Sequence, residues 1–377
     1  MADLDKLKAL ATPPAPTGWT PGVQWDGEAG SVTTYPREDA EAPRDEQWDS
    51  VLERFGLDPE RYMVDGPVRH SAWDVPGRGV QHSHRAKIVE RPERTFDVED
   101  LLDTIWTDVD YPDNPRAEWR TIQIGDTHLA KGSLDGGGTD KLIYRWQNSV
   151  KEALSLGGHY EGVHLAFLGD LIEGEVSQGG ANIAGNDLTL TESLRVARHL
   201  VSWTVQEALK VGNEVIVSAV GGNHGQTTRV QNRPHTDNHD IDVVSAVQQA
   251  FELSGLDDRI TWYYPEEGAN HVVYEVGGTV FASTHGHTFK GGPVAGAAKW
   301  WSGMCASNRP AAAAQVLMAG HFHQPVIQNF TSDKWICFGG ALEDQSTWIH
   351  EQNGTTSKPG MLTYVTRDGE PFEFSIV

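Results

Sequence analysis

The sequence predicts an α/β (α+β) protein in which stacked β-sheets are flanked by helices and preceded by a small α+β module. Two observations lead to this fold class. From residue 120 onward, short apolar runs alternate with amphipathic helical segments and then give way to many further strand-like runs. Before residue 120, Pro and Gly interrupt shorter segments. We therefore divide the 377 residues into an arm (1–40), an accessory module with a linker (41–119) and a large domain (120–377).

The elements of the first 119 residues are short. Residues 1–40 are rich in Pro, Gly, Thr and acidic residues, a composition typical of a flexible arm. Apolar residues at helical spacing predict a helix over 45–57. Strands are predicted over 62–73 and 80–90, on either side of a Pro-Gly turn. The Pro-rich stretch at 111–115 is expected to be the linker.

The large domain follows from the same patterns. Amphipathic segments predict one helix over 140–155 and a longer one that starts near residue 190. Apolar runs of strand length lie at 121–125, 163–168, 214–220, 271–276, 279–284, 315–318, 326–330, 335–338, 362–366 and 372–376. So many strands after an alternating start predict more than one sheet.

The charge balance limits the possible partners. Lys and Arg total 30 against 53 Asp and Glu, which gives a formal net charge of −23. Such a surface repels polyanions, which disfavours a protein that coats nucleic acid electrostatically. A nucleic-acid enzyme is not excluded, because bound divalent ions supply positive charge locally.

The chain has no membrane or secretion signature. No apolar run approaches the length of a membrane-spanning helix, and the first residues lack a basic segment followed by an apolar core. The only cysteines are Cys305 and Cys337, so neither a disulfide framework nor a Cys-built zinc site is expected. We expect a cytoplasmic location.

Residues of metal-ligand type, most of them beside glycine, follow five predicted strands. They are Asp126-Thr127-His128, Gly169-Asp170, Gly222-Asn223-His224, His285-Gly286-His287 and Gly320-His321-Phe322-His323. The carboxyl ends of neighbouring strands meet at one edge of a sheet, and glycine lets the backbone turn sharply there. Each fragment alone occurs often by chance, and a lone core histidine is more commonly structural. Their ordered conjunction is what predicts a site.

The ligand types indicate the metal and the chemistry. Carboxylate, imidazole and amide oxygen suit Mn²⁺, Fe or Zn²⁺ better than Ca²⁺. The candidate ligands exceed the needs of one ion, whereas two ions roughly 3.5–4 Å apart use them economically. Such a pair suits in-line attack of a bridging hydroxide on phosphorus. We expect two divalent ions, Mn²⁺ first, with Fe, Zn²⁺, Ni²⁺ or Mg²⁺ as alternatives.

With these motifs, the segment 120–377 resembles the calcineurin-like metallophosphoesterase superfamily. The resemblance implies a four-layer αββα sandwich with a dimetal site at one edge. It assigns the ligands of the first ion to Asp126, His128 and His323, the bridge to Asp170, and the ligands of the second ion to Asn223, His285 and His321. It assigns to His224 the contact with phosphate and the protonation of the leaving oxygen, a role that suits imidazole.

Three points of this site stay open in the sequence. His287 competes with His285 for the second ion, and we prefer His285 because it directly follows an apolar strand. Glu173 is either a support of the ligands or a solvated charge at a helix start. Gly225 stands where many relatives carry an acidic residue, so the group that orients His224 is not evident.

Three features bear on the substrate. The hairpin at 69–94 is locally basic and either tracks a phosphate backbone or is an ordinary exposed hairpin. Arg229 and Arg233, in the polar stretch 225–242, are candidates to clamp a substrate phosphate. Lys290 and Lys299 are further candidates, together with Trp300 and Trp301, which either stack bases or belong to the core of a helix reaching 311–314.

The layout of module and domain resembles bacteriophage-encoded phosphoesterases that are described as similar to SbcD-type exonuclease subunits. The expected function is a phosphodiester hydrolase acting on nucleic acid or a nucleotide, most specifically a DNA nuclease. The alternatives are a phosphomonoesterase or a (cyclic) nucleotide phosphodiesterase and, least favoured, a non-catalytic metal-binding interaction module. Self-association and a replication or repair partner are left open.

Overall fold

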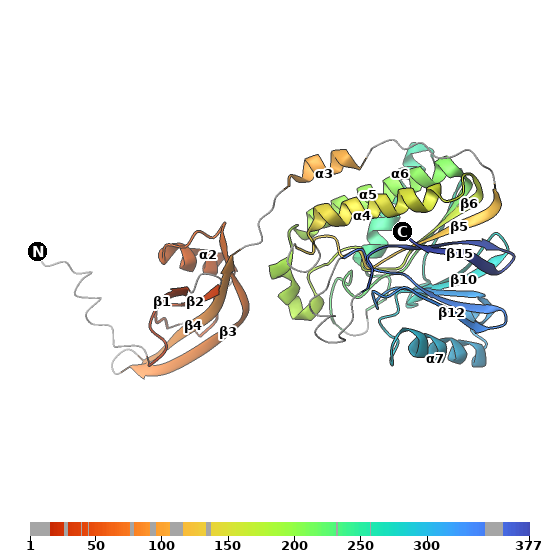
Figure 1. Ribbon diagram of the computed structural model, residues 1–377. Coiled ribbons are helices and arrows are strands. Elements are labelled where there is room, and N and C mark those ends of the chain that lie inside the picture. Colours follow the sequence, from red (N-terminus) through yellow and green to blue (C-terminus); the bar gives the residue numbers. More distant parts are fainter. Residues whose placement is uncertain are drawn as a thin grey trace, which may run out of the picture. The chain divides into compact units, whose positions relative to one another are not determined.

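A computed structural model shows two compact units, residues 1–93 and 94–377 (Figure 1). The structure describes residues 16–25, 29–38, 40–43, 45–75, 79–90, 96–105, 116–132, 137–230, 233–256, 258–343 and 357–377. The boundary lies earlier than the predicted division at 119/120. The reason is α3 (Val98–Thr104), which buries Val98 and Leu102 in the core of the second unit.

The first unit is a four-stranded sheet with one helix. It contains β1 (Gly22–Trp25), β2 (Ala29–Thr33), α2 (Asp45–Arg54), β3 (Tyr62–Val75) and β4 (Gly79–Glu90), with the strand order β1-β2-β4-β3. The expected flexible arm is therefore wrong for residues 22–25 and 29–33, because β2 pairs with the distant β4. Residues 1–15 and the predicted linker lie outside the described residues.

The second unit contains two sheets. The six-stranded sheet has the order β15-β14-β5-β6-β7-β8, from β5 (Arg116–Ile124), β6 (Tyr160–Phe167), β7 (Gly212–Ala219), β8 (Ile260–Tyr263), β14 (Leu362–Arg367) and β15 (Glu370–Ile376). Strands β5 to β8 are parallel. The five-stranded sheet has the order β12-β13-β11-β10-β9, from β9 (His271–Val276), β10 (Thr279–Thr284), β11 (Val316–Ala319), β12 (Val326–Thr331) and β13 (Lys334–Phe338).

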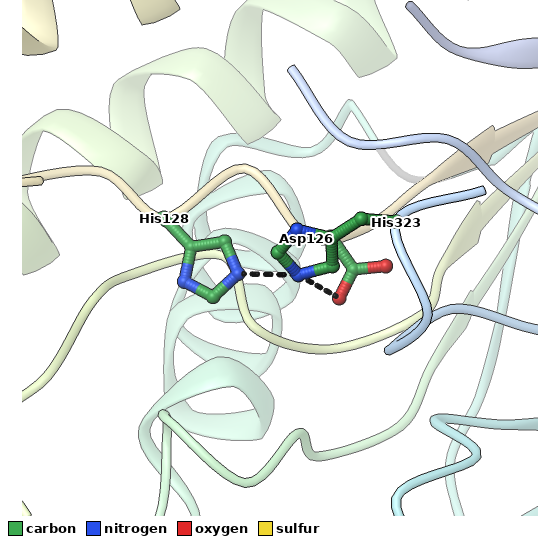
Figure 2. Close-up of side chains that lie close together, drawn as sticks. All are labelled: Asp126, His128 and His323. Atoms are coloured by element: carbon green, nitrogen blue, oxygen red, sulfur yellow. Dashed lines mark hydrogen bonds and ion pairs between the residues drawn. The ribbon is translucent and has the colours of Figure 1, made fainter. Parts of the chain in front are cut away.

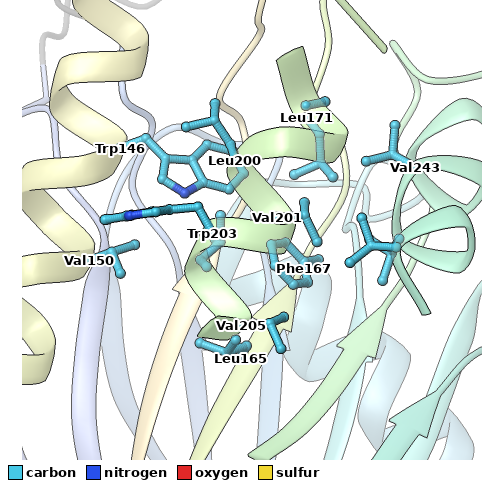
Figure 3. Packing of buried hydrophobic residues seen from close by; sticks show 14 of the residues in the cluster. Trp146, Val150, Leu165, Phe167, Leu171, Leu200, Val201, Trp203, Val205 and Val243 are labelled. Atoms are coloured by element: carbon cyan, nitrogen blue, oxygen red, sulfur yellow. The ribbon is translucent and has the colours of Figure 1, made fainter. Parts of the chain in front are cut away.

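Helices cover the outer face of each sheet. The six-stranded sheet packs against α4 (Thr139–Ser155), α5 (Leu190–Val211) and α6 (His239–Ser254), with Trp146, Leu200 and Val243 in this layer (Figure 3). The five-stranded sheet packs against α7 (Pro293–Ala306) and the short 3₁₀ helix η2 (Pro310–Ala313). A third apolar cluster, from strands of both sheets, fills the space between them. The predicted αββα arrangement is confirmed.

Local signals explain where α5 and α6 begin. Thr189 caps α5 by accepting a hydrogen bond from the Glu192 backbone N–H, and the Glu192 side chain accepts one from the Thr189 backbone N–H. Asn238 caps α6, which takes up the last four residues of the polar loop predicted over 225–242. In the part of the chain that the structure describes, no helix has the length and apolar character needed to cross a membrane.

A polar network crosses the space between the two sheets. Nδ1 of His164 lies 3.2 Å from Oγ1 of Thr121, and Nε2 lies 2.9 Å from the Tyr274 hydroxyl. The Tyr274 hydroxyl also lies 2.7 Å from the hydroxyls of Ser218 and Ser283. Both ring nitrogens of this fully buried histidine are hydrogen-bonded. Burial lowers the pKa of His164 to about 3, so it is neutral.

Candidate metal centre

The polar segments predicted from the sequence converge at one edge of the second unit. Three of them follow the parallel strands β5, β6 and β7, and two follow β10 and β11, which are parallel neighbours in the other sheet. A hydrogen bond of 2.7 Å from Nδ1 of His285 to the Leu168 carbonyl joins the two sheets at this edge. The topology thus brings residues 126 to 323 into one site.

Asp126, His128 and His323 form the first cluster (Figure 2), with one ligand atom of each within 4.8 Å of the others. Nε2 of His128 lies 3.2 Å from Nε2 of His323, which lies 3.7 Å from Oδ1 of Asp126. Oδ1 of Asp126 is buried and has no hydrogen-bond partner among the described residues. A cation at this point satisfies all three atoms.

Asp170, His285 and His321 form the second cluster by the same criterion. Nε2 of His285 lies 3.0 Å from Oδ2 of Asp170 and 3.1 Å from Oδ1 of Asn223. The predicted ligands of the second ion are therefore gathered in one place.

His287 stands outside both clusters. Its ring centroid is 5.4 Å from that of His285, and its buried Nδ1 has no hydrogen-bond partner among the described residues. The geometry thus favours His285 over His287 as the ligand.

Each imidazole of the first cluster is anchored by a carboxylate behind it. Nδ1 of His128 donates to Oε2 of Glu173 at 2.8 Å, and Nδ1 of His323 donates to Oε1 of Glu343 at 2.6 Å. Lys131 forms an ion pair with the other oxygen of Glu343. Anchoring Nδ1 leaves Nε2 as the nitrogen that faces the cluster, as in metal-bound histidines. Glu173 is buried, so it supports the ligands and is not a solvated charge.

These carboxylates are ionised. Burial alone would raise the pKa of Glu173, but hydrogen bonds from His128 and His224 outweigh burial and lower the pKa to about 2. Burial acts the same way on Glu343, where the hydrogen bond from His323 outweighs it and leaves the pKa well below its ordinary value. Two negative charges therefore lie behind the histidines of the first cluster.

The second cluster contains two imidazoles whose pKa values are shifted in opposite directions. Burial would lower the pKa of His285, but the charge of Asp170 raises it to about 9. Burial, aided by the charge on His285, lowers the pKa of His321 to about 3. Without an ion, His285 is protonated and pairs with Asp170. An ion at this position must displace that proton, so we expect metal binding to weaken as the pH falls.

His224 lies next to the first cluster. Its ring centroid is 4.5 Å from that of His128, and its Nδ1 donates to the Glu173 carbonyl at 3.0 Å. Oε2 of Glu173 lies 3.2 Å from the same nitrogen. Burial would lower the pKa of His224, but Asp170 and Glu173 outweigh it and raise the pKa to about 9. Glu173 therefore supplies the orienting carboxylate that the sequence left unassigned.

Asp240 holds the loops that carry Asp170 and Asn223. Its carboxylate accepts hydrogen bonds from the backbone N–H groups of Asp170 and Gly222 at 2.9 Å and of Leu171 at 3.0 Å. A Cβ at Gly225 would come within 2.4 Å of Oδ2 of Asp240. Glycine is therefore required at 225 because this buried carboxylate occupies the space.

The backbone of the ligands is strained. Five of the predicted ligands have positive φ, from 47° to 72°: Asp126, His128, Asp170, His321 and His323. Gly169 also has a positive φ, 88°, and a Cβ there would come within 2.5 Å of the Gly222 nitrogen. Strain of this kind collects at functional sites.

The candidate substrate residues differ in position. Arg229 and Arg233 line a cavity that is also lined by His287. Lys290 and Lys299 are exposed and, in the described residues, form no hydrogen bond or ion pair with either cluster. Trp301 is fully buried and stacks on Phe330, so base stacking by this residue is excluded.

The basic hairpin is partly neutralised in the described residues. Lys87 pairs with Asp65 at 2.8 Å, and the Arg85 guanidinium bonds to Ser31 and Gln24. Residues 76–78 and 91–95 lie outside the described residues. The Lys87–Asp65 pair favours the ordinary exposed hairpin, whereas the Arg85 charge is held by neutral groups.

No protein-family model and no curated protein matches the chain. Among solved structures, the chain is similar to Vps29 from Entamoeba histolytica, as a single mutant (13% identity, TM-score 0.33, 66% of this chain and 87% of that chain). The zinc complex of wild-type Vps29 from the same organism is 13% identical, with a TM-score of 0.31, and the match covers 67% of this chain and 88% of that chain. A conserved Streptococcus pneumoniae protein described as a predicted phosphoesterase is 13% identical, with a TM-score of 0.30, and the match covers 67% of this chain and 86% of that chain.

Proposed function

We propose that the chain is a dimetal phosphoesterase that hydrolyses a phosphodiester of a nucleic acid or nucleotide. The observation that carries this proposal is the anchoring of the site histidines through Nδ1. His128, His285 and His323 each bond to a carboxylate or carbonyl behind the ring and turn Nε2 toward a carboxylate oxygen or another histidine. Two clusters of this composition side by side match the ligand requirement of a two-ion phosphoesterase.

The donor sets fit divalent ions of the Mn²⁺, Fe or Zn²⁺ type. Asp126, His128 and His323 would hold one ion, and Asn223, His285 and His321 the other, with Asp170 shared. When bound, such ions supply positive charge for phosphate oxygens and lower the pKa of water. The unsatisfied oxygen of Asp126 and the two facing Nε2 atoms of the first cluster support this assignment.

His224 would act as the general acid. Its Nδ1 is held by Glu173, so the proton available for transfer is the one on Nε2. Its raised pKa keeps this proton in place at neutral pH, where it can be given to the leaving oxygen. Asp170 fixes the same residue through a 2.6 Å hydrogen bond from the His224 backbone N–H.

A nuclease is our first choice of substrate class, and hydrolysis of a small nucleotide is the second. The observation that favours the second is the cavity beside the second cluster. Its volume of about 310 Å³ suits a small ligand and not a duplex.

The test is hydrolysis by Mn²⁺-reconstituted protein of linear single- and double-stranded DNA, beside bis- and mono-p-nitrophenyl phosphate. We expect diester cleavage that a chelator abolishes. His224→Ala should keep both ions and lose about 10²–10⁴-fold in turnover of DNA, because it removes the general acid that protonates the sugar oxygen as it leaves. His199→Ala, which changes a histidine on α5, is the matched control.

Three outcomes separate the candidates. Cleavage of DNA supports the nuclease, whereas cleavage of the small diester alone supports the nucleotide phosphodiesterase. A preference for the monoester supports a phosphomonoesterase. Full turnover in His224→Ala would remove His224 from the mechanism, and fewer than two ions per chain would favour a binding module without catalysis.

A further inference from the structure

The cavity beside the second cluster is built from three segments of the chain. The loop after β7 supplies Gly222 and Arg229, the approach to α6 supplies Arg233 and His235, and the segment after β10 supplies His287. The His287 ring centroid is 5.4 Å from that of His285 and 6.5 Å from that of His235. His287 therefore connects the cavity with the proposed metal site.

Arg229 is an exposed residue in the wall of this cavity, and three hydrogen bonds position its guanidinium. Its Nε donates to the Val176 carbonyl at 3.1 Å, Nη1 to Oε1 of Gln226 at 2.8 Å and Nη2 to Oγ of Ser177 at 3.1 Å. All three acceptors are neutral. Since a guanidinium has five N–H donors, two remain for a ligand.

The charge of Arg229 is not balanced locally. In the part of the chain that the structure describes, no carboxylate pairs with Arg229, whereas the neighbouring Arg233 has Oδ2 of Asp237 at 3.5 Å. The three neutral acceptors position the guanidinium without cancelling its charge. A planar guanidinium with free donors binds phosphate better than any other side chain.

Other groups of the wall are also suited to an anion. The buried Nδ1 of His287 has no hydrogen-bond partner among the described residues. Asp237 is the one carboxylate in the described lining, and it pairs with Arg233. The cavity thus offers donors with little opposing charge.

We propose that this cavity binds a second phosphate group of the substrate, with Arg229 as its main ligand. The inference rests on the proposed function, since the first phosphate is the one hydrolysed at the metal site. It narrows the substrate to a nucleotide or oligonucleotide end that carries a phosphate beyond the scissile one. The small volume accommodates a phosphate with part of its sugar.

Two chromogenic esters test this subsite. Thymidine 5′-(p-nitrophenyl phosphate) and its 3′-phosphorylated form release the same leaving group and differ by one phosphate. For the unmodified chain with Mn²⁺, we expect the 3′-phosphate to lower KM about tenfold or more, the usual effect of a charge-assisted hydrogen bond. Arg229→Met should abolish this difference between the esters. Arg195→Met, which removes an exposed arginine of α5, should retain it.

A purely structural role of Arg229 predicts a different result. Arg229 also ties its loop to η1 (Ser177–Gly185) and the residue before it, and loss of that tie alone would slow both esters equally. An unchanged KM ratio in Arg229→Met, or equal KM values for both esters in the unmodified chain, would overturn the subsite and leave the phosphoesterase standing.

A binding measurement separates the subsite from catalysis. Calorimetric titration with thymidine 3′,5′-bisphosphate and with thymidine 5′-monophosphate needs no turnover. If neither ester is hydrolysed, the proposed function fails, and the titration still decides the subsite. About tenfold tighter binding of the bisphosphate, lost in Arg229→Met, supports it, and equal binding of both nucleotides overturns it.

Discussion

His164 and three histidines of the candidate metal centre, His128, His285 and His323, are buried in the same unit, yet their surroundings differ. Both nitrogens of His164 are hydrogen-bonded, to Thr121 and Tyr274. In His128, His285 and His323, Nδ1 alone is tied to the surrounding protein scaffold, while Nε2 faces other ligand-type atoms. The second difference is in the backbone, because His128 and His323 have positive φ and His164 does not.

This comparison separates a structural histidine from a ligand. A buried network in which every polar atom is hydrogen-bonded stabilises the packing of two sheets and needs no further ligand. A histidine that is anchored at one nitrogen and left open at the other, on a strained backbone, is arranged for something outside the chain. Burial alone does not distinguish the two cases.

The largest effect is expected where the two clusters meet. Asp170→Asn removes the negative charge of the carboxylate that we assign as a ligand of both ions. It should therefore lose bound metal and reduce activity to background, a larger loss than the 10²–10⁴-fold expected on removal of a general acid. Metal analysis and the bis-p-nitrophenyl phosphate assay measure this, with the exposed-turn variant Asp333→Asn as the control. Full metal content in Asp170→Asn would show that Asp170 is not a shared ligand.

The supports behind the histidines should have intermediate effects. Glu173→Gln and Glu343→Gln weaken the anchors of His128 and His323, and we expect 10–100-fold losses in metal affinity or activity. Glu173→Gln should be the more severe, because Glu173 also holds His224. Metal titrations compare these variants with Glu207→Gln, a buried carboxylate on α5. Equal behaviour of all three variants would mean that the anchors do not act on the site.

The smallest effect on activity is expected at His164, where the predicted change concerns stability instead. Its pKa is about 3 in the folded chain and 6.5 when unfolded, so only the unfolded state binds a proton between these values. The free energy of unfolding should fall as the pH drops from 6.5 toward 3, by up to about 1.4 kcal/mol per pH unit from this group. Urea unfolding of metal-free protein at several pH values measures it.

His164→Leu provides the comparison for that slope. In this variant, the slope of the free energy of unfolding against pH should fall by the contribution of one proton. Its turnover when loaded with metal should be unchanged, since His164 lies outside the site. An identical pH dependence in His164→Leu and the unmodified chain would contradict the assignment of His164 as a neutral structural residue.

Much of the site could be predicted because its ligands follow strands in short local motifs. The supports could not be predicted in this way. Glu343 and Asp240 lie in segments without a motif, and they meet the ligands only through the topology of the two sheets. Glu173 was visible in the sequence, but its role depended on whether it is buried.

The same holds for the fold: elements specified by local sequence could be predicted, and elements that depend on pairing with distant residues could not. Elements with clear periodicity, such as α5 and β9, could be placed from the sequence. Strands β1 and β2 could not, because they are short and lie in a Pro- and Gly-rich region. They are stabilised by pairing with each other and by the pairing of β2 with the distant β4. Helix α6 begins in a polar stretch whose capping residue, Asn238, resembles a loop residue.

The strained ligand backbone sets a trade-off between stability and function. Each non-glycine residue in a sparsely populated conformation costs about 1–3 kcal/mol. Glycine at His321 or Asp126 would relieve this cost and remove the metal ligand in the same step. Selection for higher thermodynamic stability therefore favours the loss of these side chains, whereas selection for activity retains them. A descendant of this chain that gave up catalysis would be expected to accumulate glycine first at these strand ends.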